Sequence, residues 1–221
     1  MIKTLILDFE GTIADTRTSV VSTLEATIEA MHLQKPSRVT LESLTGLPFK
    51  EMIARATCLE DDEKLEEANL IYSLLYDKIS LNTVKLFPDV IDSLKVISDA
   101  GIKIVVVSDQ CRKCLEKQLR RLGIMRYVDL VRGVEDIEYA KPAPDLVCEI
   151  MAITESHAYE TLVVGDTTYD VEMGNRAHCI TCAVSYGCHT GEQLREKNPM
   201  FVMNRFLGIE AVCIKSLDME P

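Results

Sequence analysis

The chain has 221 residues, of which 47% are hydrophobic and 27% charged, and its formal net charge is −11. This length and composition suit a globular protein with a sizeable core in one domain or slightly more, and the negative charge argues against a nucleic-acid partner. No apolar run approaches the roughly 18 residues of a membrane span and no signal-peptide pattern opens the chain, so we expect a soluble, cytoplasmic protein without a membrane partner.

Strand and helix alternate over most of the chain. Short β-branched runs predict buried strands at residues 3–8, 102–108, 129–132, 162–166 and 179–184, and helical patterns lie at residues 89–100, 112–122 and 144–153. Their continuous rather than alternating apolarity is typical of parallel strands that are covered on both faces. The order therefore predicts an α/β fold with a doubly wound, Rossmann-like parallel sheet.

Residues 17–84 interrupt this alternation. Helices are predicted at residues 20–33, 49–57 and 61–81, with a Gly46-Leu47-Pro48 turn between the first two and no strand. We therefore expect an α/β core domain of residues 1–16 and 85–221, into which a small helical cap domain of residues 17–84 is inserted. The last dozen residues show no clear pattern for any element.

Polar residues follow the predicted strands at their carboxyl ends. The first strand delivers Asp8 and then Glu10, the second delivers Ser108 and Asp109, and the fourth delivers Asp166 and, four residues on, Asp170. In open α/β sheets, ligands bind at this edge, so these side chains should lie together. Lys141 precedes Pro142, which biases it away from helix and onto a loop.

Clustered carboxylates repel one another unless a cation is present, and Mg2+ needs only oxygen ligands. An aspartate that faces such an ion stays ionised and can act as a nucleophile. A hydroxyl from Ser108, the Lys141 ammonium and backbone N–H groups of the turn after the strand then suit a phosphoryl group. Each residue alone is more often a turn or cap, but the ordered set favours chemistry.

Four ordered motifs resemble the haloacid dehalogenase superfamily, in its capped branch of phosphoglycolate phosphatase-like and β-phosphoglucomutase-like members. They are Asp8-Phe9-Glu10-Gly11-Thr12, Ser108, Lys141-Pro142-Ala143-Pro144 and Gly165-Asp166-Thr167-Thr168-Tyr169-Asp170. Leu86-Phe87-Pro88 and Gly46-Leu47-Pro48 also resemble phosphoglycolate phosphatase-like members. The resemblance spans nearly the whole chain and is least specific in the cap.

The resemblance implies a role for each matching residue. Asp8 would attack phosphorus and form an aspartyl-phosphate, and Glu10 would protonate the leaving group and then deprotonate water. The expected phosphate-binding residues are Gly11, Thr12, Ser108, Asp109 and Lys141. The expected Mg2+ ligands are Asp8, the backbone carbonyl of Glu10 and Asp166, with Asp170 completing the acidic site or orienting Lys141.

Two residues depart from the family pattern. Glu10 stands where the family usually has Asp, which leaves the backbone carbonyl unchanged but lengthens the side chain. A misplacement of about 1 Å can cost on the order of a hundredfold in rate, so we expect a slower enzyme rather than a dead one. Asp109 stands where Asn or Gly is usual, and we expect it to cap the following helix.

Hydrolysis of a small phosphomonoester, such as phosphoglycolate or a sugar phosphate, is the favoured function. A non-catalytic phosphate- or metal-binding protein is the main alternative; a phosphomutase or a pyrophosphatase is a lesser one. Thr45, Gly46 and Lys50 flank the expected specificity loop of the cap, although each is more often an ordinary turn or solvated residue. From the insertion point we also expect the cap to open and close about residues 13–17 and 82–88.

The eight cysteines allow two interpretations. Cys111 and Cys114, like Cys179 and Cys182, have the CxxC spacing of zinc ligands. Residues three apart in a strand point to opposite faces, however, so Cys179 and Cys182 could hold one ion only in a distorted strand. The favoured interpretation is that most of the cysteines are small buried hydrophobic residues.

Overall fold

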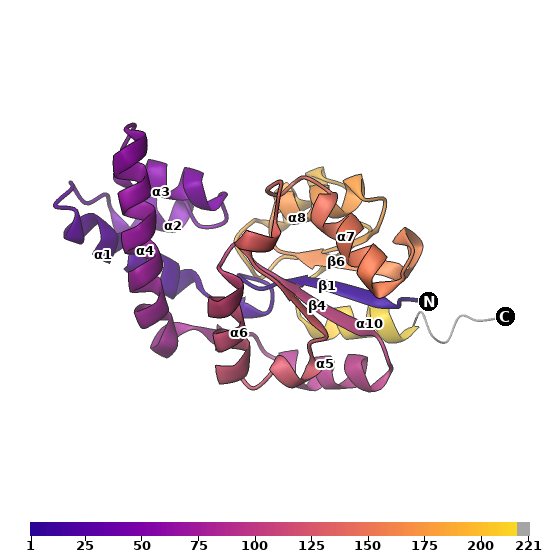
Figure 1. Ribbon diagram of the computed structural model, residues 1–221. Helices are drawn as coiled ribbons and strands as arrows, with labels where there is room; N and C mark the ends of the chain where they lie inside the picture. Colours follow the sequence, from indigo (N-terminus) through magenta and orange to yellow (C-terminus); the bar gives the residue numbers. More distant parts are fainter. Residues whose placement is uncertain (216–221) are drawn as a thin grey trace. The chain divides into compact units, whose positions relative to one another are not determined.

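The computed structural model describes residues 1–215, which divide into two compact units (Figure 1). One unit joins Met1–Ala14 to the chain from Leu86 onward, and the other is Asp15–Lys85. Two short strands, β2 (Ala14–Asp15) and β3 (Lys85–Leu86), pair where the chain passes from one unit to the other. Within residues 1–215, no helix combines the length and the apolar character that a membrane span requires.

The first unit is built on a six-stranded sheet in the order β5-β4-β1-β6-β7-β8, and every neighbouring pair is parallel. Its strands are β1 (Thr4–Asp8), β4 (Lys103–Val107), β5 (Leu130–Arg132), β6 (Thr161–Gly165), β7 (Ile180–Val184) and β8 (Phe201–Met203). All five strands expected from the sequence are present, and β1 lies between β4 and β6 as a fully buried strand. The α/β fold with a parallel sheet is therefore confirmed.

Helices cover both faces of this sheet (Figure 1). They are α5 (Val90–Asp99), α6 (Arg112–Arg121), α7 (Asp145–Thr154), α8 (Thr168–Arg176), α9 (Gly191–Glu196) and α10 (Leu207–Lys215), with short 3-10 turns at Met125–Tyr127, Val134–Asp136 and Ala158–Glu160. On one face, Ile6 and Val163 of the sheet pack against Val147 and Ile150 of α7. Fully burying each such side chain stabilises the fold by about 1.5–3 kcal/mol.

The ends of the helices follow the local signals in the sequence. Gly101 and Gly123 come just after α5 and α6 with positive φ angles of 79° and 76°, which glycine adopts without steric cost. Pro144 immediately precedes α7, where its missing N–H costs nothing.

The structure adds elements that the sequence patterns did not predict. The strand β8 and the helices α8 and α9 are short, and the patterns did not single them out. The segment from Glu210, for which no element was expected, is helical as far as Lys215 in α10, and residues 216–221 lie outside the described chain. The apolar side of α10 buries Ile209 and Cys213, too few positions to show a helical period.

The second unit consists of α1 (Arg17–Ala30), α2 (Arg38–Ser43), α3 (Phe49–Thr57) and α4 (Asp62–Thr83) around its own apolar core. Three of these helices match the predicted segments, whereas α2 was not predicted and lies before the Gly46-Leu47-Pro48 turn. Ser37 begins α2 by accepting a hydrogen bond from the backbone N–H of Thr40.

Candidate active site

The carboxyl ends of three adjacent strands, β1, β4 and β6, bring together the polar residues that the sequence singled out. Asp8 is the last residue of β1, Ser108 directly follows β4, and Asp166 directly follows β6. All three side chains are buried. Strand order alone accounts for this grouping, because β1 pairs with β4 on one side and with β6 on the other.

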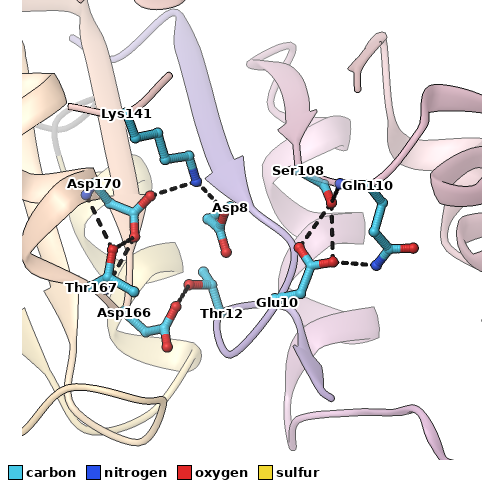
Figure 2. A network of polar contacts seen from close by, with 9 residues as sticks. All are labelled: Asp8, Glu10, Thr12, Ser108, Gln110, Lys141, Asp166, Thr167 and Asp170. Carbon is cyan, nitrogen blue, oxygen red and sulfur yellow. Dashed lines mark hydrogen bonds and ion pairs between the residues drawn. The ribbon is translucent and has the colours of Figure 1, made fainter. Parts of the chain in front are cut away.

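Lys141 lies among the carboxylates (Figure 2). Its ammonium group contacts Asp8 and donates to Oδ1 of Asp170 at 2.7 Å. Asp170 is in turn held by Thr167, whose hydroxyl donates to Oδ2 at 2.6 Å and whose backbone N–H donates to the same oxygen at 3.1 Å. The bond from the Thr167 backbone N–H is one half of the capping box that begins α8; in the other half, the Asp170 backbone N–H donates to the Thr167 hydroxyl at 3.3 Å. The start of the helix thus also fixes the carboxylate that orients Lys141.

The Asp166 carboxylate is held by two hydrogen bonds and lies close to the backbone of two glycines. Its Oδ1 accepts from the Thr12 hydroxyl at 3.2 Å and its Oδ2 accepts from the backbone N–H of Cys188 at 2.6 Å. A Cβ atom at Gly11 or at Gly187 would collide with this carboxylate, and Gly11 also has a positive φ of 70°. Only glycine at both positions leaves room for Asp166, which therefore has little freedom to move.

Negative charge dominates this cluster. Burial raises the pKa of Asp8 well above its usual range, because Lys141 offsets it only in part while Asp170, Glu10 and Asp166 add to it. Burial and Asp170 likewise raise the pKa of Asp166 to about 6. Burial disfavours the charged form of Lys141, but Asp170 and Asp8 outweigh it and raise its pKa, so its ammonium persists. One cation does not balance these carboxylates.

The residues present fit a divalent metal ion. One oxygen from each of Asp8, Asp166 and Asp170 lies within 4.8 Å of the others, and all three residues are buried. The donors are oxygens only, which suits a hard cation, and a positive ion would relieve the repulsion that helps raise the pKa values of Asp8 and Asp166. The cluster can therefore hold a metal ion.

Glu10 lies in a second group of contacts, on the β4 side of Asp8 (Figure 2). The Ser108 hydroxyl lies 3.1 and 2.9 Å from the two oxygens of the Glu10 carboxylate, and the side-chain amide of Gln110 also donates to that carboxylate. Ser108 in turn accepts from the backbone N–H of Gln110 at 2.9 Å. Burial raises the pKa of Glu10, although the bonds from Gln110 and Ser108 counteract it. The longer side chain thus reaches the Ser108 hydroxyl.

Asp109 does not cap the following helix, so that expectation was wrong. The residue that begins α6 is Cys111, whose sulfur accepts from the backbone N–H of Cys114 at 3.2 Å. Asp109 is exposed, two positions before the cap.

The other predicted site residues lie as follows. Gly11 and Thr12 form the turn after β1 and contact Asp166, whereas Thr45, Gly46 and Lys50 belong to the helical unit. Their part in substrate binding stays a prediction, as does the hinge at residues 13–17 and 82–88.

Sequence reasoning missed several residues that support the site: Gln110, Thr167, Tyr186 and Cys188. Tyr186 donates from its hydroxyl to the backbone carbonyl of Thr12 at 2.8 Å and so fixes the turn after β1. The capping box at Thr167 and Asp170 could have been found in the sequence, since the two residues have the required spacing. The contacts of Gln110 and Cys188 join distant segments and leave no local signal.

The cysteines divide into several kinds. Cys111 and Cys114 form a disulfide, so their sulfurs are not the thiolates that zinc requires. Among residues 1–215, the acidic cluster is the group that could hold a metal ion. Cys179, Cys182 and Cys213 are buried, and burial raises each pKa to about 12. The expectation that most of the cysteines are buried was wrong, because Cys58 and Cys148 are exposed and the other three are half-buried.

Comparisons with known proteins agree with this geometry. Residues 5–184 match the family model described as haloacid dehalogenase-like hydrolase. The chain is 30% identical over 212 residues to "Putative pyrophosphatase PpaX" of Clostridium perfringens, covering 95% of this chain and 96% of that protein. It is 26% identical over 205 residues to "Probable phosphatase IndB" of Dickeya dadantii, covering 91% of this chain and 89% of the other.

A solved structure shows the same fold. The crystal structure titled as that of "a predicted phosphoglycolate phosphatase" from Haemophilus somnus superimposes with a TM-score of 0.87 at 18% identity and covers 96% of this chain and 97% of its own. Together with the family model, which spans most of the sequence and all four motifs, these matches identify the chain as a member of the haloacid dehalogenase-like hydrolase family.

Proposed function

We propose that this hydrolase is a Mg2+-dependent phosphatase that cleaves a small phosphorylated compound through an aspartyl-phosphate on Asp8. The observation that carries the proposal is the buried position of Asp8. It contacts the Lys141 ammonium and lies within an oxygen cluster that fits a metal ion. A carboxylate in such a setting can attack phosphorus, and the positive charges around it stabilise the transferring phosphoryl group.

Three residues would hold Mg2+: Asp8 and Asp166 through their carboxylates and Glu10 through its backbone carbonyl. The ion, when bound, supplies positive charge that offsets the charge of the phosphoryl oxygens. Lys141 provides a second positive charge, which Asp170 orients through the 2.7 Å bond to its ammonium. The Ser108 hydroxyl and the backbone N–H of Thr12 are the proposed donors to the remaining phosphoryl oxygens. The Gly11 N–H, also expected from the sequence to bind phosphate, donates to the backbone carbonyl of Ala14 at 2.8 Å instead.

Glu10 would act as the general acid and base. Protonation of the leaving oxygen and deprotonation of the attacking water each require its carboxyl group to approach the reacting phosphorus. In the structure it is bound to Ser108 and Gln110 instead. Substrate binding would therefore have to displace Glu10 from the Ser108 hydroxyl, which gives a physical reason for the slow turnover expected from the sequence.

Two substrate classes are candidates. The site itself suits any small phosphomonoester, because it contacts only the phosphoryl group. The name of the Clostridium perfringens relative supports inorganic pyrophosphate as a second candidate. We propose that the helical unit, Asp15–Lys85, is the cap that selects between them, with Thr45, Gly46 and Lys50 in its specificity loop.

The test is phosphate release from pyrophosphate, phosphoglycolate and a panel of sugar phosphates, with and without Mg2+. The Asp8→Asn variant is the blank, because amide for carboxylate keeps the shape of the side chain but removes the nucleophile. Release that requires Mg2+ and disappears in Asp8→Asn would support the proposal. If no compound is hydrolysed above the blank while the protein still binds Mg2+, the non-catalytic phosphate- or metal-binding alternative is favoured.

A further inference from the structure

Cys111 and Cys114 lie at the start of α6, where Cys111 is three residues beyond Ser108. Cys111 begins the helix, and both sulfurs are joined in a disulfide across the first turn. Both residues are half-buried rather than part of the core. The catalytic scheme proposed above uses neither residue.

The first turn of α6 favours a reactive thiol. Cys111 accepts the Cys114 N–H at the positive end of a ten-residue helix, and Arg112 and Lys113 lie between the two cysteines. The helix start and the Lys113 ammonium favour a thiolate, which is the form that exchanges with disulfides. Part of the positive charge is offset, because the Glu135 carboxylate accepts from the Arg112 backbone N–H and Asp136 pairs with the Arg112 guanidinium at 3.0 Å. The pair therefore has the chemistry of a reversible dithiol rather than of an inert buried cystine.

The same turn is connected to the active site by a short chain of contacts. Gln110, next to Cys111, donates from its side chain to Glu10 and from its backbone to Ser108 (Figure 2). The backbone carbonyl of Gln110 accepts from Val134 at 2.9 Å, which anchors this segment to the turn after β5. A change in the first turn of α6 is thus transmitted to the residues that hold Glu10.

We propose that Cys111 and Cys114 form a redox site, oxidised by small-molecule disulfides, which fixes residues 108–110 in the arrangement that keeps Glu10 on the Ser108 hydroxyl. In oxidation, the Cys111 thiolate attacks a disulfide R–S–S–R, forming Cys111–S–S–R and releasing R–S−. The Cys114 thiolate then attacks the Cys111 sulfur, forming the Cys111–Cys114 disulfide and releasing the second R–S−. Two protein thiols and one disulfide give one protein disulfide and two small thiols.

The expected consequence for activity rests on the proposed function. In the disulfide form, the Glu10 carboxylate occupies the hydroxyl that a phosphoryl group would use. Reduction relaxes the first turn of α6 and lets Glu10 leave Ser108 more easily. We expect kcat/KM to be about tenfold lower in the oxidised form, the size of effect that a misplacement of well under 1 Å produces in a catalytic group.

The experiment uses a Cys58→Ser/Cys148→Ser background, which removes the two exposed free thiols. This protein is equilibrated with mixtures of glutathione and glutathione disulfide, alkylated and digested with trypsin. Because Arg112 and Lys113 separate the two cysteines, trypsin releases them on different peptides unless a disulfide joins them. A glutathione-dependent linked peptide is the expected result, and its absence at every ratio would overturn the inference.

Hydrogen exchange then tests the connection to residues 108–110 without any substrate. The amides of Gln110 and Cys114 should exchange more slowly in the oxidised protein than in the reduced protein. The Cys111→Ser variant is the matched control, because serine keeps a hydrogen-bond acceptor at the start of α6 but forms no disulfide. It should show the reduced pattern under both conditions; equal exchange in the oxidised and reduced parent would contradict the proposal.

Activity separates the two proposals. If the reduced protein hydrolyses no compound of the panel, the phosphatase function is contradicted. The linked-peptide and hydrogen-exchange measurements still test the redox site, because neither requires a substrate. Reduced and oxidised proteins that are equally active would overturn the link between the disulfide and Glu10.

Discussion

The two sides of Asp8 differ in how closely they follow the family. On the β6 side, Lys141, Asp166 and Asp170 match the family motifs; the two buried aspartates form an oxygen cluster with Asp8, and Lys141 pairs with Asp8 and Asp170. On the β4 side lie both departures, Glu10 and Asp109, together with Gln110 and the cysteine pair. The comparison indicates that the residues of the charged cluster follow the family pattern, whereas the proposed proton-transfer residue, Glu10, departs from it.

The largest effect should come from the residue between the two sides. Asp8→Asn removes the nucleophile, so kcat should fall by about 10⁴-fold or more. Phosphate release by the purified variant and parent measures this. Circular dichroism controls for folding, and a variant that is folded and retains more than a few per cent of the parent activity would rule out Asp8 as the nucleophile.

Changes at Glu10 should show how far the β4 side of Asp8 limits the rate. Glu10→Gln removes the proton donor and should lower kcat by on the order of 10² to 10⁴. Glu10→Asp has a shorter reach toward Ser108 and Gln110 and restores the usual family residue, so kcat/KM should rise by about tenfold. Steady-state kinetics of both variants on one substrate tests the pair.

An unchanged rate in Glu10→Asp would mean that the site is already adapted to glutamate. Equal activity of Glu10→Gln and the parent would mean that another group transfers the proton.

A smaller effect is expected at Gln110. Gln110→Ala removes one donor to the Glu10 carboxylate, and a hydrogen bond to a charged group contributes about 1.5–3 kcal/mol. Water should replace much of the lost hydrogen-bond energy at this half-buried position. The remaining loss weakens the hold on Glu10 and frees the Ser108 hydroxyl for substrate, so KM should fall by roughly three- to tenfold. A raised KM would show that Gln110 assists substrate binding instead, and Gln34→Ala, at an exposed position between α1 and α2, is a control for a glutamine change elsewhere.

The smallest effect concerns the metal cluster and pH. The raised pKa of Asp166, about 6 against 3.8 for an ordinary aspartate, means that ionisation destabilises the metal-free protein. The contribution of Asp166 to the stability of the metal-free protein is therefore largest below pH 3.8, the pKa of an ordinary aspartate. This contribution is lost as the pH rises through about 6. Mg2+ binds the ionised form, so it should raise Tm by a few degrees near pH 8 and hardly at all near pH 5.

Thermal melts with and without Mg2+ at several pH values measure this, with Asp8→Asn as the variant in which the shift should shrink. A Tm shift of the same size at both ends of the range would contradict the role of the acidic cluster.

The sequence predicted the parts of the fold that depend on short-range patterns. The five buried strands and the residues at their carboxyl ends follow from apolar runs that end in a polar residue, and parallel pairing then brings Asp8, Ser108 and Asp166 together. The hydrogen bonds from Gln110 to Glu10 and from Cys188 to Asp166 could not be predicted in this way. They join residues 100 and 22 positions apart, and their existence depends on side-chain packing that no local pattern encodes.

The helix start at Cys111 shows a similar limit. Asp109 is a better cap by residue preference, but the exact register of α6 is set by the contacts of its first turn with the segment after β5. Arg112 donates its backbone N–H to Glu135 at 3.0 and 2.9 Å, and this tertiary contact outweighs the preference of a single residue.

The glycines on either side of Asp166 have a consequence for the size of the ion that the cluster selects. Backbone at Gly11 and Gly187 closes on the carboxylate and two donors hold its oxygens, so it cannot swing outward to accommodate a larger ion. Ca2+ requires six to eight ligands at longer distances and a flexible site, whereas Mg2+ accepts few protein ligands in a fixed geometry and retains its waters. If the cluster holds a metal ion, as proposed, the narrow enclosure of this carboxylate would favour the smaller ion.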